Sequence, residues 1–349
     1  MTDTVVISKR KIGPDAPPYV IAEMSANHNG SIEAALRIIE EAKKAGADAL
    51  KMQTYTADTL TLDCADEDFV IHGGLWAGRT LHDLYKEAHT PWEWHKPLFE
   101  HARKVGITIF STPFDSTAVD LLEDLNAPAY KIASFEAVDL ALIRYVAATG
   151  KPMIISTGMA DAEEILEAVD TARQAGCKEL ALLHCVSGYP APAGEYNLRT
   201  IPDMAERFGV PVGLSDHTLS NATAIASVAL GACVIEKHFT LDRSGGGPDD
   251  SFSVEPAQLA SLCADVRTAW QALGAAGYHR RSSEKGNVQF RRSLYFVFDL
   301  PQGTVITPES VRSVRPGYGL APKFLPEILG RKVCRDIAKN TPVTLECFE

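Results

Sequence analysis

The sequence has no run of about 18 consecutive apolar residues, and so it predicts no transmembrane helix. Its first residues, MTDTVVISKRKIG, lack the apolar core of a signal peptide, and we therefore expect a cytoplasmic protein. Basic residues number 34 against 45 acidic ones, which disfavours nucleic acid and anionic membranes as partners. An anionic small molecule stays compatible with the net charge of −11, because a few lysines in a cleft can dominate locally.

The seven cysteines form no CxxC pair, which argues against a disulfide framework and against a cysteine zinc site. We expect them to be reduced, buried thiols. The length of 349 residues suits two domains, or one barrel of about 250 residues followed by a small module.

A short apolar run followed by an amphipathic helical pattern recurs along most of the chain. The runs occupy residues 19–25, 49–54, 108–113, 129–134, 153–158, 180–186, 212–218 and 232–240. Eight parallel strands covered by helices predict an α/β fold, the (β/α)8 TIM barrel. An open doubly wound sheet is the alternative, and the lack of GxGxxG after a first strand counts against it.

Two segments depart from this repeat. About fifty residues separate the run 49–54 from the next strand, and such insertions usually lie over the active-site face of a barrel. Residues 274–289 have the composition of a linker, and short strands with many turns follow them. We therefore expect a catalytic barrel over 1–273, a linker over 274–289 and a small β-rich domain over 290–349.

Polar residues gather at the carboxyl ends of the expected strands, which face the active site in such barrels. They are Glu23, Ser25, Lys51, Gln53, Thr112, Lys131, Ser134, Glu136, Ser156, His184, Ser215, His217, Glu236 and His238. A charge inside an apolar strand costs several kcal/mol unless it is paired. Lys51, Lys131 and Glu236 therefore indicate either a site or a layer of salt bridges. The lysines and serines suit a phosphate or carboxylate group.

His217 and His238 end two neighbouring strands. Adjacent parallel strands lie about 4.8 Å apart, so both imidazoles can reach one metal ion. No cysteine accompanies them, and Glu23 and Asp216 offer oxygen donors, which favours six-coordinate Mn²⁺ or Mg²⁺ over structural zinc. Together these groups suggest carbon–carbon bond formation on a phosphorylated substrate, or phosphate ester cleavage.

Motifs along nearly the whole chain resemble the sialic acid synthase family. They are IAEMSANHNGS (21–31), KMQT (51–54), FSTPFD (110–115), KIAS (131–134), STGM (156–159), LLHCVSGYP (182–190), GLSDHT (213–218), IEKHFT (235–240) and GPDDSFS (247–253). The tail, with RRSLY, GTVIT and VRPGYG, resembles the C-terminal antifreeze-like (SAF) domain of that family. The resemblance implies condensation of phosphoenolpyruvate (PEP) with an open-chain N-acylated aminosugar, with cleavage of the PEP C–O bond.

The resemblance also implies roles for individual residues. His217 and His238 would hold a divalent metal, usually Mn²⁺, with Mg²⁺ or Co²⁺ as alternatives. PEP would be held by Lys51, Gln53, Thr112, Lys131, Ser134, Ser156 and Ser215. Ser187 stands where the family often has Asn, and Glu236 joins the substrate-binding candidates.

The catalytic candidates are Glu136, Lys131, Glu23 and Tyr189. Of these, Glu136 matches the family's carboxylate near PEP, and Tyr189 belongs to the YP motif. Glu23 and Asp249 match positions near the sugar. Arg315 matches an arginine that reaches the sugar from the partner subunit, which implies a domain-swapped homodimer.

The insertion, GGLWAGRTLHDLYKEAHTPWEWHKPLF, resembles that of pseudaminic acid synthases within the family. The implied sugar is 2,4-diacetamido-2,4,6-trideoxy-L-altrose, whose methyl groups an aromatic-rich lid would suit. Trp92 and Trp94 can instead simply pack the helix 91–104 against the barrel. Legionaminic acid and N-acetylneuraminic acid are alternative products. Two other classes stay open: a Schiff-base aldolase using Lys131 or Lys51, and an ice- or glycan-binding protein.

Overall fold

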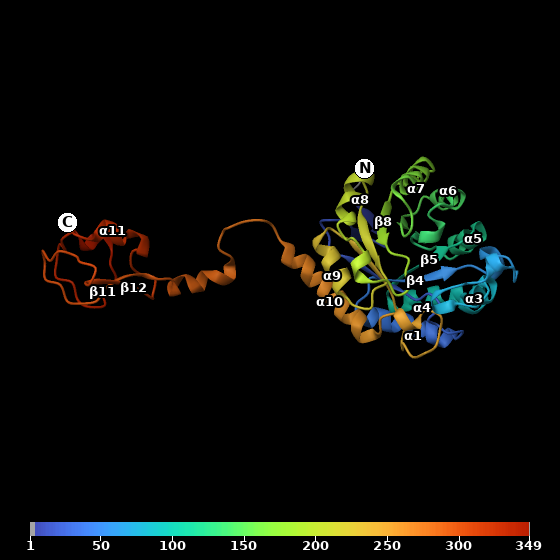
Figure 1. Cartoon of the computed structure of the whole chain (residues 1–349), viewed down its shortest axis with the longest axis horizontal. Helices are drawn as coiled ribbons and strands as arrows, with labels where there is room; N and C mark the ends of the chain where they lie inside the picture. The colour runs from blue at the N-terminus through green and yellow to red at the C-terminus, as the bar shows by residue number, and fades with distance from the viewer. Residues whose placement is uncertain (1–3, 349) are drawn as a thin grey trace. The chain divides into compact units, whose positions relative to one another are not determined.

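The computed structural model describes residues 4–348, which divide into two compact units that meet in sequence at Gly274 and Ala275. The barrel of the first unit consists of eight strands: β3 (Tyr19–Glu23), β4 (Ala49–Thr54), β5 (Thr108–Pro113), β6 (Tyr130–Ile132), β7 (Met153–Ser156), β8 (Leu180–Cys185), β9 (Val212–Asp216) and β10 (Val234–His238). They pair in parallel and close into a barrel in the order β10-β3-β4-β5-β6-β7-β8-β9 (Figure 1). The predicted TIM barrel is confirmed.

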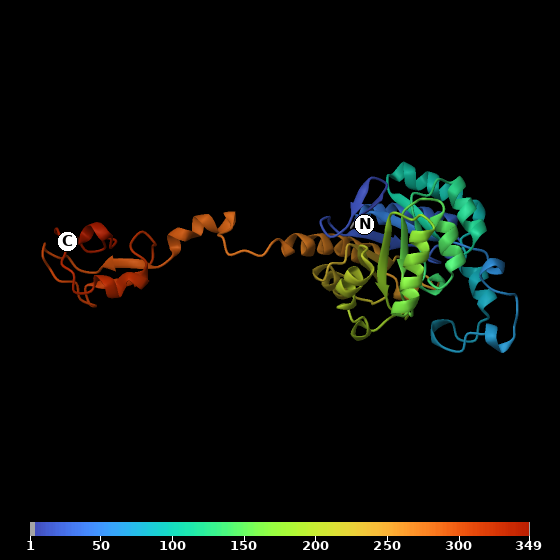
Figure 2. The same cartoon turned by 90° about the horizontal axis from the view of Figure 1, so that it is seen from above.

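Helices surround the strands of the barrel, as Figures 1 and 2 show. They are α1 (Ile32–Ala45), α4 (Trp92–Val105), α5 (Ser116–Asp124), α6 (Leu140–Ala147), α7 (Ala162–Gln174), α8 (Thr200–Phe208), α9 (Ala222–Ala229) and α10 (Pro256–Leu273). Helix α1 shows why the predicted boundaries hold. The Ser31 side chain accepts a hydrogen bond from the Ala34 amide, and Gly46 ends the helix with a φ of 90°.

The long connection after β4 forms a separate helical insertion before α4. It contains α2 (Ala57–Leu60), the 3-10 turns η1 (Glu67–Phe69) and η2 (Gly74–Trp76), and α3 (Leu81–Ala88). A bridge between Val70 and Thr80 and an ion pair of 2.7 Å between Arg79 and Glu87 hold it together. In Figure 2 its light-blue loop projects beside the helical ring. Three short 3-10 turns lie elsewhere in this unit: η3 (Ser134–Glu136), η4 (Ala193–Glu195) and η5 (Asp250–Phe252).

The barrel interior begins with an apolar layer. Its inward residues include Tyr19, Ile21, Ala49, Phe110, Ala129, Ile154, Leu183 and Val234, all buried. The hairpin of β1 (Val5–Ile7) and β2 (Arg10–Ile12) adds Val5, Ile7 and Ile12 to the same cluster. Glycine is required at position 213, because a Cβ there would lie 2.8 Å from Leu183 Cδ2 and 2.4 Å from the Val234 carbonyl oxygen. This end of the barrel is therefore closed by packed side chains.

The second unit has a sheet and a core of its own. Strands β11 (Ser293–Phe296) and β12 (Val311–Val314) pair antiparallel. Short helical segments accompany them: η6 (Ser282–Phe290), η7 (Pro322–Phe324), α11 (Leu325–Ile328) and η8 (Leu345–Cys347). Leu294, Phe296 and Val333 are buried together in its core. The predicted small β-rich module after the barrel is thus present. Among residues 4–348 no helix has the length and apolarity needed to span a membrane.

Candidate active site

A polar layer lies directly above the apolar layer inside the barrel. On each strand the next inward residue, two positions on, is polar or a thiol. The eight residues are Glu23, Lys51, Thr112, Lys131, Ser156, Cys185, Ser215 and Glu236, one from each strand, and all are buried. The period of two along a strand therefore brings together residues that are up to 213 positions apart in the sequence.

The charged members of this layer form one network of ion pairs. Lys51 Nζ lies 3.0 Å from Glu23 Oε2 and 3.5 Å from Glu236 Oε1, and Lys131 Nζ lies 3.4 Å from the same Glu236 oxygen. Thr112 accepts a hydrogen bond from Lys51 at 3.2 Å, and Ser215 donates one to Glu236 at 3.2 Å. The two sequence-based readings of these charges, a salt-bridge layer and a site, thus describe one arrangement.

The pKa shifts in this network favour binding of an anion. Burial raises the pKa of Glu23, which Lys51 only partly offsets. Burial alone would raise the pKa of Glu236 as well, but Lys131 and Lys51 hold it below its ordinary value. Burial lowers the pKa of Lys131, although Glu236 beside it acts in the opposite direction. Two lysines thus share this buried layer with two carboxyl groups, of which Glu23 takes up a proton more readily than a free carboxyl group. An anionic group that entered this layer would provide the lysines with a further partner.

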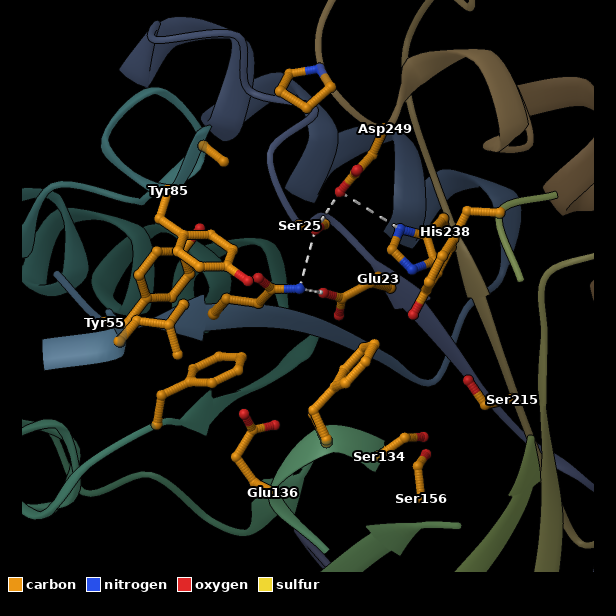
Figure 3. A pocket seen from close by; sticks show the side chains of 18 of the residues that line it. Glu23, Ser25, Tyr55, Tyr85, Ser134, Glu136, Ser156, Ser215, His238 and Asp249 are labelled. Atoms are coloured by element: carbon orange, nitrogen blue, oxygen red, sulfur yellow. Dashed lines mark hydrogen bonds and ion pairs between the residues drawn. The ribbon is translucent and has the colours of Figure 1, made fainter. Parts of the chain in front are cut away.

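Hydroxyl groups complete the anion-binding side of the pocket. Within the described residues, Ser156 Oγ and Ser187 Oγ are buried without a hydrogen-bond partner. Ser134 Oγ accepts a hydrogen bond from the Gly158 amide at 3.1 Å and lies beside Ser156 (Figure 3). A Cβ on Gly158 would lie 2.2 Å from Ser187 Oγ, so glycine is needed here. Unpartnered buried hydroxyls fit the oxygens of a phosphate or carboxylate.

His217 and His238 face each other at the mouth, with ring centroids 5.4 Å apart. His217 Nδ1 donates to the Val186 carbonyl at 2.8 Å. Burial would lower the pKa of this ring, but its contacts with Cys185 and with the Val186 carbonyl raise that pKa above its ordinary value. Burial and the neighbouring His217 hold the pKa of His238 well below its ordinary value, so its ring is neutral. Its Nδ1 is buried without a hydrogen-bond partner. His238 is therefore the neutral imidazole of the pair, whereas His217 would have to give up its extra proton when it binds a metal, with its Nδ1 already oriented by the Val186 carbonyl.

Oxygen donors for a metal are fewer than the sequence suggested. Asp216 points outward, where it pairs with Lys237 at 2.7 Å, so the expectation that it lies near the metal is wrong. Alternation along β9 explains this, because Ser215 faces inward. Asp249 Oδ2 lies 3.9 Å from His238 Nδ1. Among residues 4–348 no group of three His, Cys, Asp or Glu is placed to hold a metal.

Glu136 stands at the end of η3, close to the serines (Figure 3). Burial raises its pKa from 4.5 to about 7. Its Oε2 is buried and has no hydrogen-bond partner among the described residues. A carboxyl group with a pKa near neutrality can accept or release a proton during a reaction.

A polar rim lies above the charged layer. Ser25 Oγ donates to Asp249 Oδ2 at 2.5 Å, and Gln53 Nε2 donates to Ser25 Oγ at 2.9 Å and to Glu23 Oε1 at 3.0 Å. Figure 3 shows this chain of contacts running from Glu23 to Asp249 and on to His238. It supplies donors and acceptors for the hydroxyl groups of a sugar.

The opposite wall of the pocket is apolar and comes largely from the insertion. The cavity has a volume of about 390 Å³, and its apolar lining includes Tyr55, Leu60, Ile71, Trp76, Leu81, Leu84, Tyr85, Ala88 and Phe114. Trp76 is anchored by a hydrogen bond from its indole to the Pro248 carbonyl at 3.1 Å. Its ring lies 5.9 Å from that of Tyr189, which in turn packs against His217 at 4.4 Å.

The chain spans the two parts of a known family architecture. Residues 38–278 match the NeuB family, and residues 291–349 match the SAF domain. The chain belongs to the NeuB family. It is 45% identical to the pseudaminic acid synthase of Campylobacter jejuni strain 81-176, over 93% of this chain and 94% of that protein. The Helicobacter pylori protein of the same name is 42% identical over 95% of this chain and 98% of its own length.

A solved structure agrees with this membership in the NeuB family. The N-acetylneuraminic acid synthetase of Leptospira borgpetersenii has a TM-score of 0.72 and 32% identity, covering 82% of this chain and 96% of that one. NeuB-family synthases join PEP to a sugar, so the chain is an enzyme that forms a carbon–carbon bond. The aldolase and ice-binding alternatives are left without support.

Most of the sequence-predicted site residues of this NeuB-family chain line one cavity. They are Glu23, Lys51, Gln53, Lys131, Ser134, Glu136, Ser156, Tyr189, Ser215, His217, Glu236, His238 and Asp249. Thr112 and Ser187 are not among the lining residues of the cavity: Thr112 contacts Lys51, and Ser187 lies next to Gly158. Arg315 is an exposed residue of the second unit. Trp94 packs against the core and against His28, at 5.4 Å between rings, so the TPWEW segment does its packing away from the cavity.

Sequence reasoning missed several residues that line the cavity of this NeuB-family chain. Tyr55, Phe114 and Cys185 each lie two positions beyond an inward residue, so the period of two could have found them. Tyr85 and Leu84 lie on α3, and no pattern in the sequence says which face of that helix meets the barrel.

Proposed function

We propose that the chain condenses PEP with 2,4-diacetamido-2,4,6-trideoxy-L-altrose to form pseudaminic acid and phosphate. The observation that carries the proposal is the division of one cavity into a cationic, hydroxyl-lined side and an apolar wall. Two relatives of similar length that are named pseudaminic acid synthases support the choice of sugar.

In this proposal the polar layer binds PEP. Lys51 and Lys131 would pair with its phosphate and carboxylate, and Ser134, Ser156 and Ser215 would donate hydrogen bonds to the same oxygens. The buried hydroxyl of Ser156 would gain the partner that it lacks.

His217 and His238 would hold a divalent ion, Mn²⁺ in the first instance, which when bound polarises the aldehyde of the sugar. Asp249, Ser25 and Gln53 would orient the sugar by hydrogen bonds to its hydroxyl groups. PEP C3 would attack the aldehyde carbon and form the new C–C bond, while the aldehyde oxygen takes up a proton and PEP C2 becomes electron-poor. Water would then add to C2 and give up a proton to Glu136. Its pKa of about 7 suits that task at neutral pH. The PEP C–O bond then breaks and phosphate leaves.

The apolar wall gives a physical reason for the deoxy sugar. A site built to bond hydroxyls leaves its own polar groups unpaired when the substrate carries a methyl group instead. Leu81, Leu84 and Tyr85 on α3 present apolar surface to the cavity. We place the methyl and acetamido groups of the sugar against this wall.

We further propose a domain-swapped homodimer in the cytoplasm, in which Arg315 of the partner subunit reaches the acyl group of the sugar. The exposed position of Arg315 is compatible with such a role.

The deciding experiment is competition among three sugars at equal concentration with PEP and Mn²⁺. The three are the diacetamido-trideoxy-altrose, the precursor of legionaminic acid and N-acetylmannosamine, with products identified by mass and NMR. We expect the altrose derivative to be consumed first. A clear preference for N-acetylmannosamine would contradict the proposed sugar. PEP labelled with ¹⁸O in its bridging oxygen should give labelled phosphate, and unlabelled phosphate would contradict C–O cleavage.

A further inference from the structure

Lys237 is a buried lysine that faces away from the cavity. It lies on β10 between the inward residues Glu236 and His238, and only 1% of its surface is exposed. No role in binding or catalysis is available to it from that position, because alternation along the strand points its side chain toward the helices. A buried ammonium group needs partners, and those of Lys237 are all in one short segment.

That segment carries His217. Lys237 Nζ donates to Asp216 Oδ2 at 2.7 Å, to the Thr218 carbonyl at 2.6 Å and to the Ser220 carbonyl at 3.3 Å. The three donors of an ammonium group are thus matched by three acceptors. Asp216 Oδ1 also accepts from the Thr218 amide at 2.9 Å, which folds the chain tightly around His217.

The backbone hydrogen bonds between β9 and β10 cannot by themselves fix the position of His217. Pairing between β9 and β10 ends at Lys237 and Asp216, so His217 lies just beyond the last paired residue. The Lys237 side chain extends the link between the two chain segments past the end of the ladder. From the other side, the His217 amide donates to Tyr196 Oη at 2.6 Å, and its carbonyl accepts from Ala191 at 3.1 Å.

We propose that Lys237 is a positioning residue that sets His217 opposite His238. Strand β10 then supplies His238 directly. Through Lys237, the residue before it, the same strand also orders the segment that carries His217. The separation of 5.4 Å between the two rings depends on this contact. The inference rests on the proposed metal role of the two histidines, but it concerns the order of the segment 216–220.

The test uses full-length protein with two substitutions, Lys237→Met together with Asp216→Asn. The pair removes both buried charges, so no carboxylate is left stranded. The amide oxygen that Asp216→Asn introduces would still accept from the Thr218 amide. Asp216→Asn alone is the comparison that isolates the ion pair, because Lys237 keeps its bonds to both carbonyls while its ammonium group loses the carboxylate. Arg267→Met is a second control, because Arg267 bonds the Gly46 carbonyl at 2.7 Å and Asp48 at 3.3 Å on another part of the barrel.

Two measurements are needed. Hydrogen exchange in metal-free protein should show faster exchange of amides 217–221 in the double variant than in the native chain or either control. Mn²⁺ titration followed by electron paramagnetic resonance should show affinity lower by about tenfold or more, as for other residues that orient metal ligands.

A folded double variant with native exchange at 217–221 overturns the inference. So does native Mn²⁺ affinity despite faster exchange, because the segment would then be ordered by Lys237 without consequence for the histidines. If the native protein itself binds no Mn²⁺, the proposed metal role fails, and the exchange measurement still decides whether Lys237 orders the segment.

Discussion

Lys51 and Glu23 contact each other at 3.0 Å directly across the β3–β4 ladder, where they are register partners. Both are almost fully buried. Lys51 therefore contributes both to the stability of the barrel, by pairing with Glu23, and to the proposed binding of PEP. Mutation can separate these two contributions.

Lys51→Met should lower both stability and turnover. Breaking a buried pair on one side costs about 3–5 kcal/mol, because Glu23 is left without its cation. Lys51→Met combined with Glu23→Gln should recover most of the stability and none of the turnover. Urea unfolding and phosphate release from PEP measure the two effects. If the double variant is no more stable than the single one, the pair is not what holds Glu23 in place.

Glu136 should give the reaction a rising pH limb. As a base it must be ionised, so kcat/KM should increase as the pH passes through about 7. Glu136→Gln should remove this limb and slow the reaction by about 10²–10⁴-fold. A native profile that is flat between pH 6 and pH 8 would contradict the assignment.

Glu136 should also affect stability, with a definite sign. Its folded pKa of about 7 lies above the ordinary 4.5, so its stabilising contribution is present below 4.5 and is lost as the pH rises through about 7. Glu136→Gln should match the native protein near pH 4.5 and exceed it at pH 8, by on the order of 1 to 3 kcal/mol. Thermal unfolding across this range measures the difference, and a gap that does not change with pH would argue against a raised pKa.

His217→Ala and His238→Ala should each abolish Mn²⁺ retention and turnover while the barrel stays folded. The reason is that the two rings are the nitrogen donors at the mouth, and one alone is a weak site. Metal content, phosphate release and circular dichroism test this together. Full activity of the native protein after exhaustive chelation would show that the reaction needs no metal.

Leu84→Ser should reduce kcat/KM for the trideoxy sugar by about tenfold or more and affect N-acetylmannosamine less, because it places an unpaired hydroxyl in the apolar wall. Trp94→Phe is the matched control, since Trp94 packs outside the cavity. Equal losses for both sugars would mean that the wall supports the fold and does not select the substrate.

Arg315→Ala mixed with Glu136→Gln should regain activity if the site is shared between subunits. One intact site then forms in each heterodimer, so a random mixture should reach about a quarter of native activity. Heterodimers verified by differential tags that stay inactive would mean that each site is built within one chain.

The barrel and most of its site were predictable because one periodicity governs both. The repeated apolar strands followed by helices predict the barrel. The period of two along each strand then predicts that Glu23, Lys51 and Glu236 face inward. Applied to Asp216, it would have shown that this carboxylate faces outward. The contacts of α3 with the cavity were beyond prediction, because they depend on how an insertion docks and not on its own sequence pattern.

The hairpin β1–β2 has a kinetic consequence. Val5, Ile7 and Ile12 close the far end of the barrel, so ligands reach the polar layer through the mouth. In the proposed complex PEP lies in that layer, and the sugar lies above it between Asp249 and α3. A sugar that arrives first would stand in the path of PEP. The two substrates should therefore add in a compulsory order, PEP before sugar, and excess sugar should inhibit by forming a dead-end complex.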